Sequence, residues 1–258
     1  MKQFKNTVWS YYKNHGRNFP WRETRDPYKI LVSEIMLQQT QAPRVVEKYN
    51  EFIKAFPDVF LLARAPRTKV LKLWQGLGYN RRAANLHQAA KEIVSQHKGK
   101  FPRDYTALIE LSGIGPATAG DIMAFAWNKA VVVIETNIRT VFIHYFFKDE
   151  KNIHDKDILP LIEKTLDTKN PREWYYALMD YGAMLKKTLP NPSRRSRHYA
   201  KQSPFKGSNR EIRSKILKYY LLYGIKSAKI VAASLDADET IVAKNIAAMR
   251  KEGLFKKK

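Results

Sequence analysis

Two glutamates stand where a carboxyl group could act as an acid or a base. Glu34 lies in the apolar stretch LVSEIML, and on a helix it would share one face with Gln38 and Gln41. Taken alone, this spacing favours a polar stripe on an amphipathic helix. Glu135 follows the apolar run VVVI and comes shortly before Asn137, which fits a helix cap as well as a partly buried carboxylate. Nothing in the spacing shows that the two carboxyl groups meet.

The segment LSGIGPATAG, residues 111–120, is the most informative local pattern. Gly113 and Gly115 let the backbone turn sharply, and Pro116 suits the first turn of the helix that follows. The free N–H groups and the positive dipole end at such a helix start attract phosphate. A G-x-G turn by itself favours a plain connection between helices. The strong positive charge of the chain favours a helix-hairpin-helix that binds the DNA backbone without reading sequence.

The net charge points to a polyanionic partner. The 258 residues include 47 Lys and Arg against 24 Asp and Glu, a formal net charge of +23. Residues 186–258 hold 19 basic and 5 acidic side chains, whereas residues 1–185 hold 28 and 19. A solubilising surface is the plain alternative. Binding to a phosphate backbone explains the concentrated charge better, because each phosphate that a cationic side chain neutralises releases a condensed counterion. We therefore expect a nucleic-acid partner.

Composition excludes several classes of protein. The chain has no cysteine, which excludes disulfides, thiol catalysis, iron–sulfur clusters and thiolate zinc sites, so we expect no metal and no cofactor. No stretch of about 18 apolar residues is present, and we expect no association with a membrane. The first 16 residues lack the apolar run of a secretory signal. We therefore expect a cytoplasmic protein, associated with the nucleoid if the source is prokaryotic.

The elements that must position these groups are mostly helices. Asp26 and Pro27 predict an N-cap and a first helical position, opening a helix that contains Glu34. Residues 131–135 are β-branched but only five in number, so a buried loop, a helix entry and a strand all fit. Further helices are predicted over residues 44–53, 68–74, 82–97, 105–111, 116–129, 137–147, 159–166 and 172–185.

The chain changes character at Lys186. Residues 186–206 are polar, basic and interrupted by prolines, which predicts a loop or linker. Residues 207–258 contain three short helical patterns, enough for a small helical module that binds DNA. Two interpretations of this module stay open: a winged helix, and a helical extension packed on the main body.

Seven segments in order resemble the helix-hairpin-helix DNA glycosylases over roughly residues 18–185, and most closely the adenine DNA glycosylases of the MutY type. They are PWRETRDPY (20–28), SEIMLQQTQ (33–41), LWQGLGYNRRAANLH (73–87), KFP (100–102), LSGIGPATAG (111–120), ETNIRTV (135–141) and ALMDYGAM (177–184). The resemblance implies an all-α, two-lobed glycosylase fold followed by the small C-terminal helical module. Residues 1–185 would form the glycosylase domain, with a six-helix lobe over about 27–135 and a second lobe from about 1–26 and 136–185.

The resemblance also implies roles for individual residues. Glu34 aligns with the glutamate that protonates the departing base and helps to activate water, which needs a carboxyl group still protonated near neutral pH. Glu135 stands where the family has an aspartate that stabilises the oxocarbenium-like transition state, and Asn137 matches a family asparagine two residues later. The expected base-pocket residues are Trp21, Arg22 and Tyr176. The expected DNA contacts are Gln38, Gln39, Tyr79, Arg81, Gly113, Gly115, Ala117, Thr118, Arg194, Arg195 and Arg197.

Three departures from the family pattern concern the chemistry. Glu135 replaces the aspartate, and its extra methylene moves the carboxylate by about an ångström, a displacement that matters for catalysis. Ala117 occupies the position of the Schiff-base lysine of endonuclease III, so we expect a monofunctional enzyme that leaves the strand intact. Tyr176 lies where the family places a Glu or Gln that recognises adenine, and a tyrosine cannot copy that two-pronged contact.

A further departure concerns the iron–sulfur loop. Lys186, Ser193, Ser196 and approximately Gln202 stand where the family has its four cluster cysteines. The basic loop over residues 193–198 is expected to keep a role in DNA contact.

We interpret the chain as a monofunctional, monomeric DNA glycosylase of base excision repair that acts on double-stranded DNA with a mismatch or lesion. Adenine opposite 8-oxoguanine or guanine is the first-choice substrate. One alternative is another mismatched or damaged base, such as thymine or uracil opposite guanine. The other alternative is a DNA protein that binds lesions without catalysis.

Overall fold

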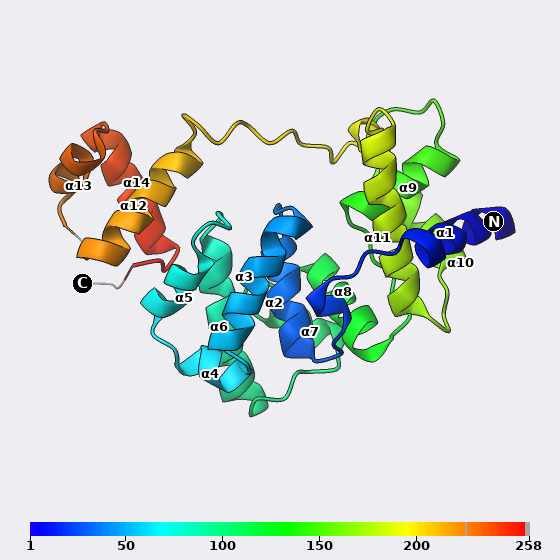
Figure 1. Cartoon of the computed structure of the whole chain (residues 1–258), viewed down its shortest axis with the longest axis horizontal. Helices are drawn as coiled ribbons and strands as arrows, with labels where there is room; N and C mark the ends of the chain where they lie inside the picture. Colours follow the sequence, from blue (N-terminus) through cyan, green and yellow to red (C-terminus); the bar gives the residue numbers. More distant parts are fainter. Residues whose placement is uncertain (225, 256–258) are drawn as a thin grey trace. The chain divides into compact units, whose positions relative to one another are not determined.

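A computed structural model describes residues 1–224 and 226–255, and in this part of the chain every regular element is a helix (Figure 1). An isolated bridge joins Ile153 and Ser196. The helices are α1 (Lys2–His15), η1 (Pro20–Arg22), α2 (Pro27–Leu37), α3 (Ala42–Ala55), α4 (Val59–Arg64), α5 (Arg67–Trp74), α6 (Arg81–His97), α7 (Tyr105–Glu110), α8 (Pro116–Trp127), α9 (Thr136–Phe146), α10 (Asp155–Thr165), α11 (Pro171–Thr188), η2 (Pro192–Arg195), α12 (Asn209–Tyr223), α13 (Ala228–Leu235) and α14 (Glu239–Lys251). None of them is long and apolar enough to cross a membrane.

The chain divides into two compact units. The first unit comprises residues 1–34, 102–110 and 114–201, and the second comprises 35–101, 111–113 and 202–258. Helices α7 and α8 contact each other, α8 also contacts α11, and all three helices belong to the first unit.

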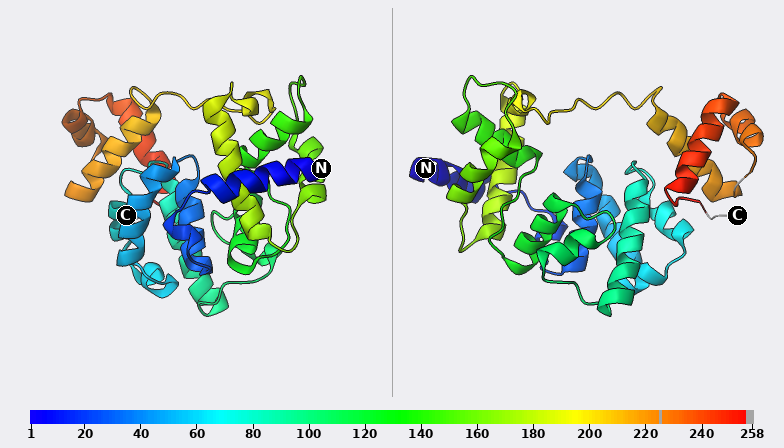
Figure 2. Two further views of the ribbon diagram at one scale, coloured as in Figure 1. Left: turned by 45° about the vertical axis from the view of Figure 1, so that its right-hand side comes forward. Right: turned by 180° about the vertical axis from the view of Figure 1, so that it is seen from behind.

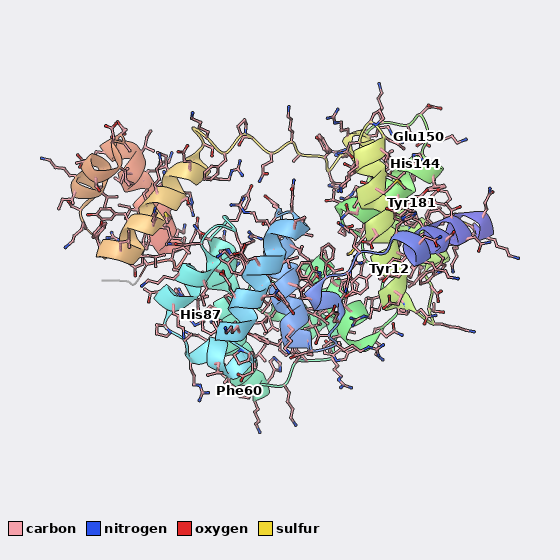
Figure 3. All side chains as sticks on the ribbon, viewed as in Figure 1. Tyr12, Phe60, His87, His144, Glu150 and Tyr181 are labelled. Atoms are coloured by element: carbon pink, nitrogen blue, oxygen red, sulfur yellow. The ribbon has the colours of Figure 1, made fainter. Side chains whose placement is uncertain are left out.

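The first unit is built on α11, which packs along α9 and α1 (Figure 1). An aromatic cluster fills this junction, where the ring of Phe4 meets those of Phe142 and Trp174 edge to face. Tyr12 of α1 is labelled in Figure 3, and its hydroxyl donates a hydrogen bond of 2.7 Å to Glu173 on α11. These contacts make α11 a rigid support for the side chains on its other faces.

The second unit has two parts with separate apolar centres. In the first part α4 packs on α6, and the buried rings of Phe52 and Trp74 meet between α3 and α5. The second part consists of α12, α13 and α14, which are coloured orange to red in Figure 2. Its apolar core is formed by the buried side chains of Leu217, Val231, Val242 and Met249. Because each part buries its own apolar side chains, α12, α13 and α14 form a helical module of their own.

Most predicted helices are present at their expected places. The helix that carries Glu34 begins at Pro27, and the Asp26 carboxylate accepts a hydrogen bond of 2.9 Å from the backbone N–H of Tyr28. Helices α1 and α4 were not expected from the sequence, because aromatic and β-branched residues weaken the helical signal of α1 and α4 has only six residues. A winged helix also needs a β-hairpin, and the described residues of the C-terminal module form none.

Candidate active site

Glu34 and Glu135 come together within the first unit. Glu34 lies on α2 and is partly buried. Burial, and to a smaller extent the negative charge of Glu135, raise the pKa of the Glu34 carboxyl from its ordinary 4.5 to about 8, against the opposing positive charge of Arg22. Glu34 therefore carries a proton at neutral pH. The helical spacing alone favoured an exposed polar stripe, whereas the structure has a partly buried acid at Glu34.

Glu135 is held in a different way from Glu34. It is the N-cap of α9, and its Oε1 accepts hydrogen bonds from the backbone N–H groups of Asn137 (2.7 Å) and Ile138 (2.8 Å). Its Oε2 accepts a third, of 3.1 Å, from the side-chain amide of Asn137. Three N–H donors and a helix N-terminus stabilise a carboxylate. The site thus pairs the proton-carrying Glu34 with Glu135, whose two oxygens accept hydrogen bonds from three N–H groups.

Asp121 on α8 is a third carboxyl group of this cluster, and sequence analysis missed it. Its side chain is only 6% exposed, and its Oδ1 is buried without a hydrogen-bond partner. Burial raises the pKa of Asp121 well above its ordinary value, and the charges of Glu34 and Glu135 act in the same direction. Its burial therefore favours the protonated form of Asp121. The apolar neighbours of Asp121 in AGDIMAFAW were the available signal of its burial.

Two glycines allow the backbone around Glu135 to pack closely. A Cβ atom on Gly120 of α8 would lie 2.7 Å from a methyl group of Val133. A Cβ atom on Gly182 of α11 would lie 2.2 Å from the backbone oxygen of Asn137. Glycine at these positions lets the 131–135 segment pass α8 and lets the start of α9 rest on α11. The 131–135 segment is a connection rather than a strand.

The predicted pocket residues Trp21, Arg22 and Tyr176 all lie in the first unit with Glu34. Arg22 donates two hydrogen bonds to Asp180, of 2.9 and 2.7 Å, and its guanidinium lies 4.3 Å from the centre of the Tyr176 ring. The Phe125 ring stacks on Tyr176 with the ring centres 4.4 Å apart, and the guanidinium of Arg172 lies 5.4 Å from the centre of the Tyr176 ring. Arg22 and Tyr176 thus form one layered wall of aromatic rings and a guanidinium.

Asp180 and Arg172 support this wall, and neither was expected to do so. Burial alone would raise the pKa of Asp180, but hydrogen bonds and positive charge from Arg22, with further help from Arg17, hold it below its ordinary value. Arg172 is buried and donates to the backbone oxygens of Arg22 (2.7 Å) and Phe125. Because both guanidinium groups meet buried acceptors, the wall is rigid.

Lys186 brings an amine close to the carboxyl cluster. It lies on α11 one turn after Gly182, the residue in contact with the start of α9. Burial lowers the pKa of Lys186, while the charge of Glu135 acts against that shift. Sequence analysis treated this residue only as the replacement of a cysteine.

Comparison with known proteins places this site in a family. Residues 32–166 match the model of the HhH-GPD superfamily base excision DNA repair protein. The chain belongs to the HhH-GPD superfamily. Its hairpin is α7, the turn at residues 111–115, and α8. The expectation of an all-α helix-hairpin-helix glycosylase fold is confirmed.

Three relatives show the range of the superfamily around this chain. An adenine DNA glycosylase of Buchnera aphidicola subsp. Baizongia pistaciae is 39% identical over 187 residues, covering 70% of this chain and 52% of the relative. A thymine/uracil-DNA glycosylase of Methanothermobacter thermautotrophicus is 30% identical over 190 residues, covering 71% and 85%. The solved structure of a thermostable thymine-DNA glycosylase superposes with a TM-score of 0.66 at 29% identity, covering 71% and 86%. The chain spans about half the length of the adenine DNA glycosylases that it matches.

The hairpin turn of this HhH-GPD chain is open to solvent. Gly113, Gly115 and Ala117 are exposed, whereas Thr118 is buried at 7% exposure. Gly113 has a φ of +79°, in the left-handed region that favours glycine, and a Cβ atom there would lie 2.6 Å from that of Asn85. The exposure of Gly113, Gly115 and Ala117 therefore suits the predicted contact with phosphate, whereas the side chain of Thr118 is buried.

The predicted DNA contacts Gln38, Gln39, Tyr79 and Arg81 all belong to the second unit, where they line one groove. Buried Arg82 organises them, and sequence analysis did not single it out. Its guanidinium donates to the backbone oxygens of residues 35, 36 and 38 and to those of residues 77 and 78. A single side chain therefore joins the two turns that carry Gln39 and Tyr79.

The basic loop at residues 193–198 divides into two kinds of arginine. Arg194 is exposed, and exposed Arg197 contacts His154 at 3.2 Å. Arg195 instead donates to the backbone oxygens of residues 143, 147 and 148 at the end of α9. The expected phosphate contact of Arg195 needs correction, because its guanidinium is committed to the carbonyl groups of a helix C-terminus.

The residues at the family's cluster positions do not fit an iron–sulfur cluster. Lys186 and Gln202 cannot supply thiolates, and Ser193 and Ser196 are buried and hydrogen-bonded within the loop. Among the described residues, no group of three or more His, Asp or Glu side chains is arranged to hold a metal ion. The loop is held by hydrogen bonds and by the bridge between Ile153 and Ser196.

Proposed function

We propose that this HhH-GPD chain is a monofunctional DNA glycosylase that hydrolyses the N-glycosidic bond of a base flipped out of mismatched or damaged DNA. The observation that carries the proposal is the pair of Glu34 and Glu135 in one site. Burial raises the pKa of Glu34 to about 8, and three N–H groups donate hydrogen bonds to the carboxyl oxygens of Glu135. A carboxyl group that can donate a proton, beside a second one held by N–H donors, suits acid-assisted cleavage of a glycosidic bond.

The reaction would proceed as follows. Glu34 donates its proton to the base as the bond between C1′ and the base nitrogen breaks, and the bonding electrons leave with the base. The Glu135 carboxylate stabilises the positive charge that develops on the sugar. A water oxygen then bonds to C1′ and gives its proton to Glu34, which restores the acid. The products are the free base and an intact strand with an abasic site.

Adenine opposite 8-oxoguanine or guanine is the substrate that we propose first. Adenine DNA glycosylases of Buchnera aphidicola and of Mycobacterium tuberculosis are 39% and 40% identical to the chain over the matched segments.

Thymine or uracil opposite guanine is the second candidate substrate. The thymine/uracil-DNA glycosylase is matched over 85% of its length, against 52% for the adenine DNA glycosylase of Buchnera aphidicola subsp. Baizongia pistaciae. The single hydroxyl of Tyr176 also departs from the family's Glu or Gln at the adenine edge.

A panel of defined duplexes tests the proposal and separates the substrates. Single-turnover base release is measured, after alkaline strand cleavage, on A opposite 8-oxoguanine, A opposite G, T opposite G, U opposite G and a fully paired control. Release of adenine supports the first substrate, and release of thymine or uracil supports the second. Tight binding of a mismatch with no base release would favour a lesion-binding protein without catalysis. Glu34→Gln serves as the inactive control, with at least about 1000-fold slower release.

A further inference from the structure

Asp121 is a buried carboxyl group to which the proposed reaction assigns no task. It lies in the middle of α8, its side chain is 6% exposed, and its Oδ1 is enclosed without a hydrogen-bond partner. A buried polar atom that is left unpaired costs free energy, so each such atom in a folded protein calls for a reason. A leucine has the same branched shape and would avoid this cost. The aspartate therefore has a reason other than packing.

The backbone around Asp121 fixes this carboxyl group close to Glu135. The preceding residue, Gly120, packs so tightly that a Cβ atom there would lie 2.7 Å from a methyl group of Val133, in the segment that leads to Glu135. The hydroxyl of Tyr175 on α11 holds the same segment, because it accepts a hydrogen bond of 3.1 Å from the backbone N–H of Val133. Helix α8 and the approach to Glu135 are thus held against each other.

The titratable groups that act on Asp121 come from three other elements. They are Glu34 of α2, Glu135 at the start of α9 and the phenol of Tyr175 on α11. All three are neutral or negative, so they disfavour a negative charge on Asp121. Burial raises the pKa of Asp121 most, and the charge of Glu34 raises it more than that of Glu135 does. These surroundings favour the O–H form of Asp121 beside Glu34.

A neutral acid beside Glu34 becomes useful once Glu34 has given up its proton. The Glu34 carboxylate formed in that step would lie near the negative charge of Glu135, and like charges in a buried site repel each other. Oδ1 of Asp121 has no partner before the step, and an O–H group there gains an acceptor during it. A hydrogen bond that forms only as charge develops stabilises the transition state more than the ground state. Carboxylic acids kept neutral by an apolar site serve as such donors.

We propose that Asp121 is a positioning residue that keeps its own proton through the reaction and donates a hydrogen bond to the Glu34 carboxylate formed when Glu34 protonates the departing base. The inference rests on the proposed function, because it concerns the acid of that reaction. No bond to Asp121 forms or breaks, and the proton that moves to the base is that of Glu34. The hydrogen bond is released when water returns a proton to Glu34.

Two replacements of Asp121 separate a hydrogen-bond donor from a merely structural side chain. Asp121→Asn keeps an N–H donor and cannot ionise, whereas Asp121→Leu keeps the shape and removes the donor. Met123→Leu is the control, because it changes a buried apolar side chain of the same helix with little change in volume. The pH profile of single-turnover base release is measured for each protein, with thermal unfolding as a check on the fold.

We expect the plateau rate of Asp121→Leu to fall about 10- to 100-fold, because the Glu34 carboxylate loses a donor. For the same reason the alkaline fall of its rate should begin about one pH unit higher than in the native protein. Asp121→Asn should lose no more than about fivefold, and Met123→Leu should match the native protein within about twofold. Asp121→Leu should unfold at the same temperature as the native protein or at a higher one, since an unpaired buried polar atom is gone.

Equal losses in Asp121→Leu and Asp121→Asn would overturn the proposal. An alkaline fall that begins at a lower pH in Asp121→Leu would also overturn it, because that is the result of removing an ionised carboxylate. Should Asp121→Leu fail to fold, carbon-13 NMR of the native carboxyl groups decides, with the Asp121 signal assigned by its absence in Asp121→Asn. Asp121 should keep its proton at every pH at which Glu34 keeps its own, and earlier ionisation of Asp121 would overturn the proposal.

Base release by the native protein on the duplex panel is recorded first. Its absence on every duplex would show that the proposed function fails. Base release by the native protein, together with the contrary Asp121 results, would show that this inference alone fails.

Discussion

At the scale of single residues, the central feature is the proton on Glu34. The folded state holds the pKa of this carboxyl near 8, whereas 4.5 is ordinary for an exposed glutamate. From pH 4.5 upward the unfolded chain gives up this proton more readily than the folded one, so the folded state loses stability as the pH rises toward 8. The site therefore lowers the stability of the protein at neutral pH.

Glu34→Gln should remove this destabilisation. The amide cannot ionise, so we expect the free energy of unfolding at pH 7 to rise by up to about 3 kcal/mol, together with loss of base release. Urea unfolding at pH 7 and at pH 4.5 measures the effect, and the gain should shrink at the lower pH. A variant less stable than the native protein at pH 7 would contradict the buried, protonated Glu34.

The second prediction at this scale concerns the amine of Lys186 and covalent trapping on DNA. A monofunctional enzyme forms no Schiff base, so borohydride should trap little covalent adduct on DNA that carries an abasic site. Any slow trapping should come from Lys186, whose burial lowers its pKa and favours a neutral amine. Trapping is compared for the native chain, Lys186→Ala and the exposed control Lys187→Ala. Strand cleavage that keeps pace with base release and disappears only in Lys186→Ala would show a bifunctional enzyme.

At the scale of elements, α9 places the carboxylate of Glu135. Glu135→Gln should lose base release almost completely, because a neutral amide cannot stabilise the cationic sugar. Glu135→Asp keeps an N-cap but shortens the side chain, and it has the residue type found at this position in the family. Retained or raised base release in Glu135→Asp would mean that position 135 keeps the family role. Thermal unfolding of both variants separates loss of the cap, about 1 kcal/mol, from loss of chemistry.

The local features of the site were predictable from sequence, whereas the features that depend on packing between distant segments were not. The Asp-Pro start of α2 and the G-x-G-P hairpin are local signals, so they predicted local structure correctly. The meeting of Glu34 and Glu135 needed the family resemblance, because it depends on packing between distant segments. Asp121 and Arg82 were missed because burial of a charged residue is decided by tertiary contacts. Arg195 was misjudged because composition does not distinguish an arginine that caps a helix from one exposed to phosphate.

At the scale of the whole molecule, positive charge should govern affinity for DNA. Exposed Arg194 and Arg197 are suited to phosphate, and each lost contact lowers the salt dependence by about one unit of slope. The double replacement of both by Ala should therefore flatten the slope by up to about two units, alike on paired and mismatched duplexes. Arg195→Ala should instead destabilise the protein by about 1–3 kcal/mol, because it frees carbonyl groups at the end of α9. Equal slopes for the native protein and the double variant would contradict this assignment.

The pH dependence of single-turnover base release tests the account most directly. The rate is measured from pH 5.5 to 9.5 on the duplex that the panel identifies as substrate, with enzyme in excess and circular dichroism as a check on folding. The rate should be level below pH 7 and fall about tenfold per pH unit above about pH 8, as the Glu34 acid loses its proton. A rate that rises through pH 8, or that stays level to pH 9.5, would contradict the assignment of Glu34 as the acid.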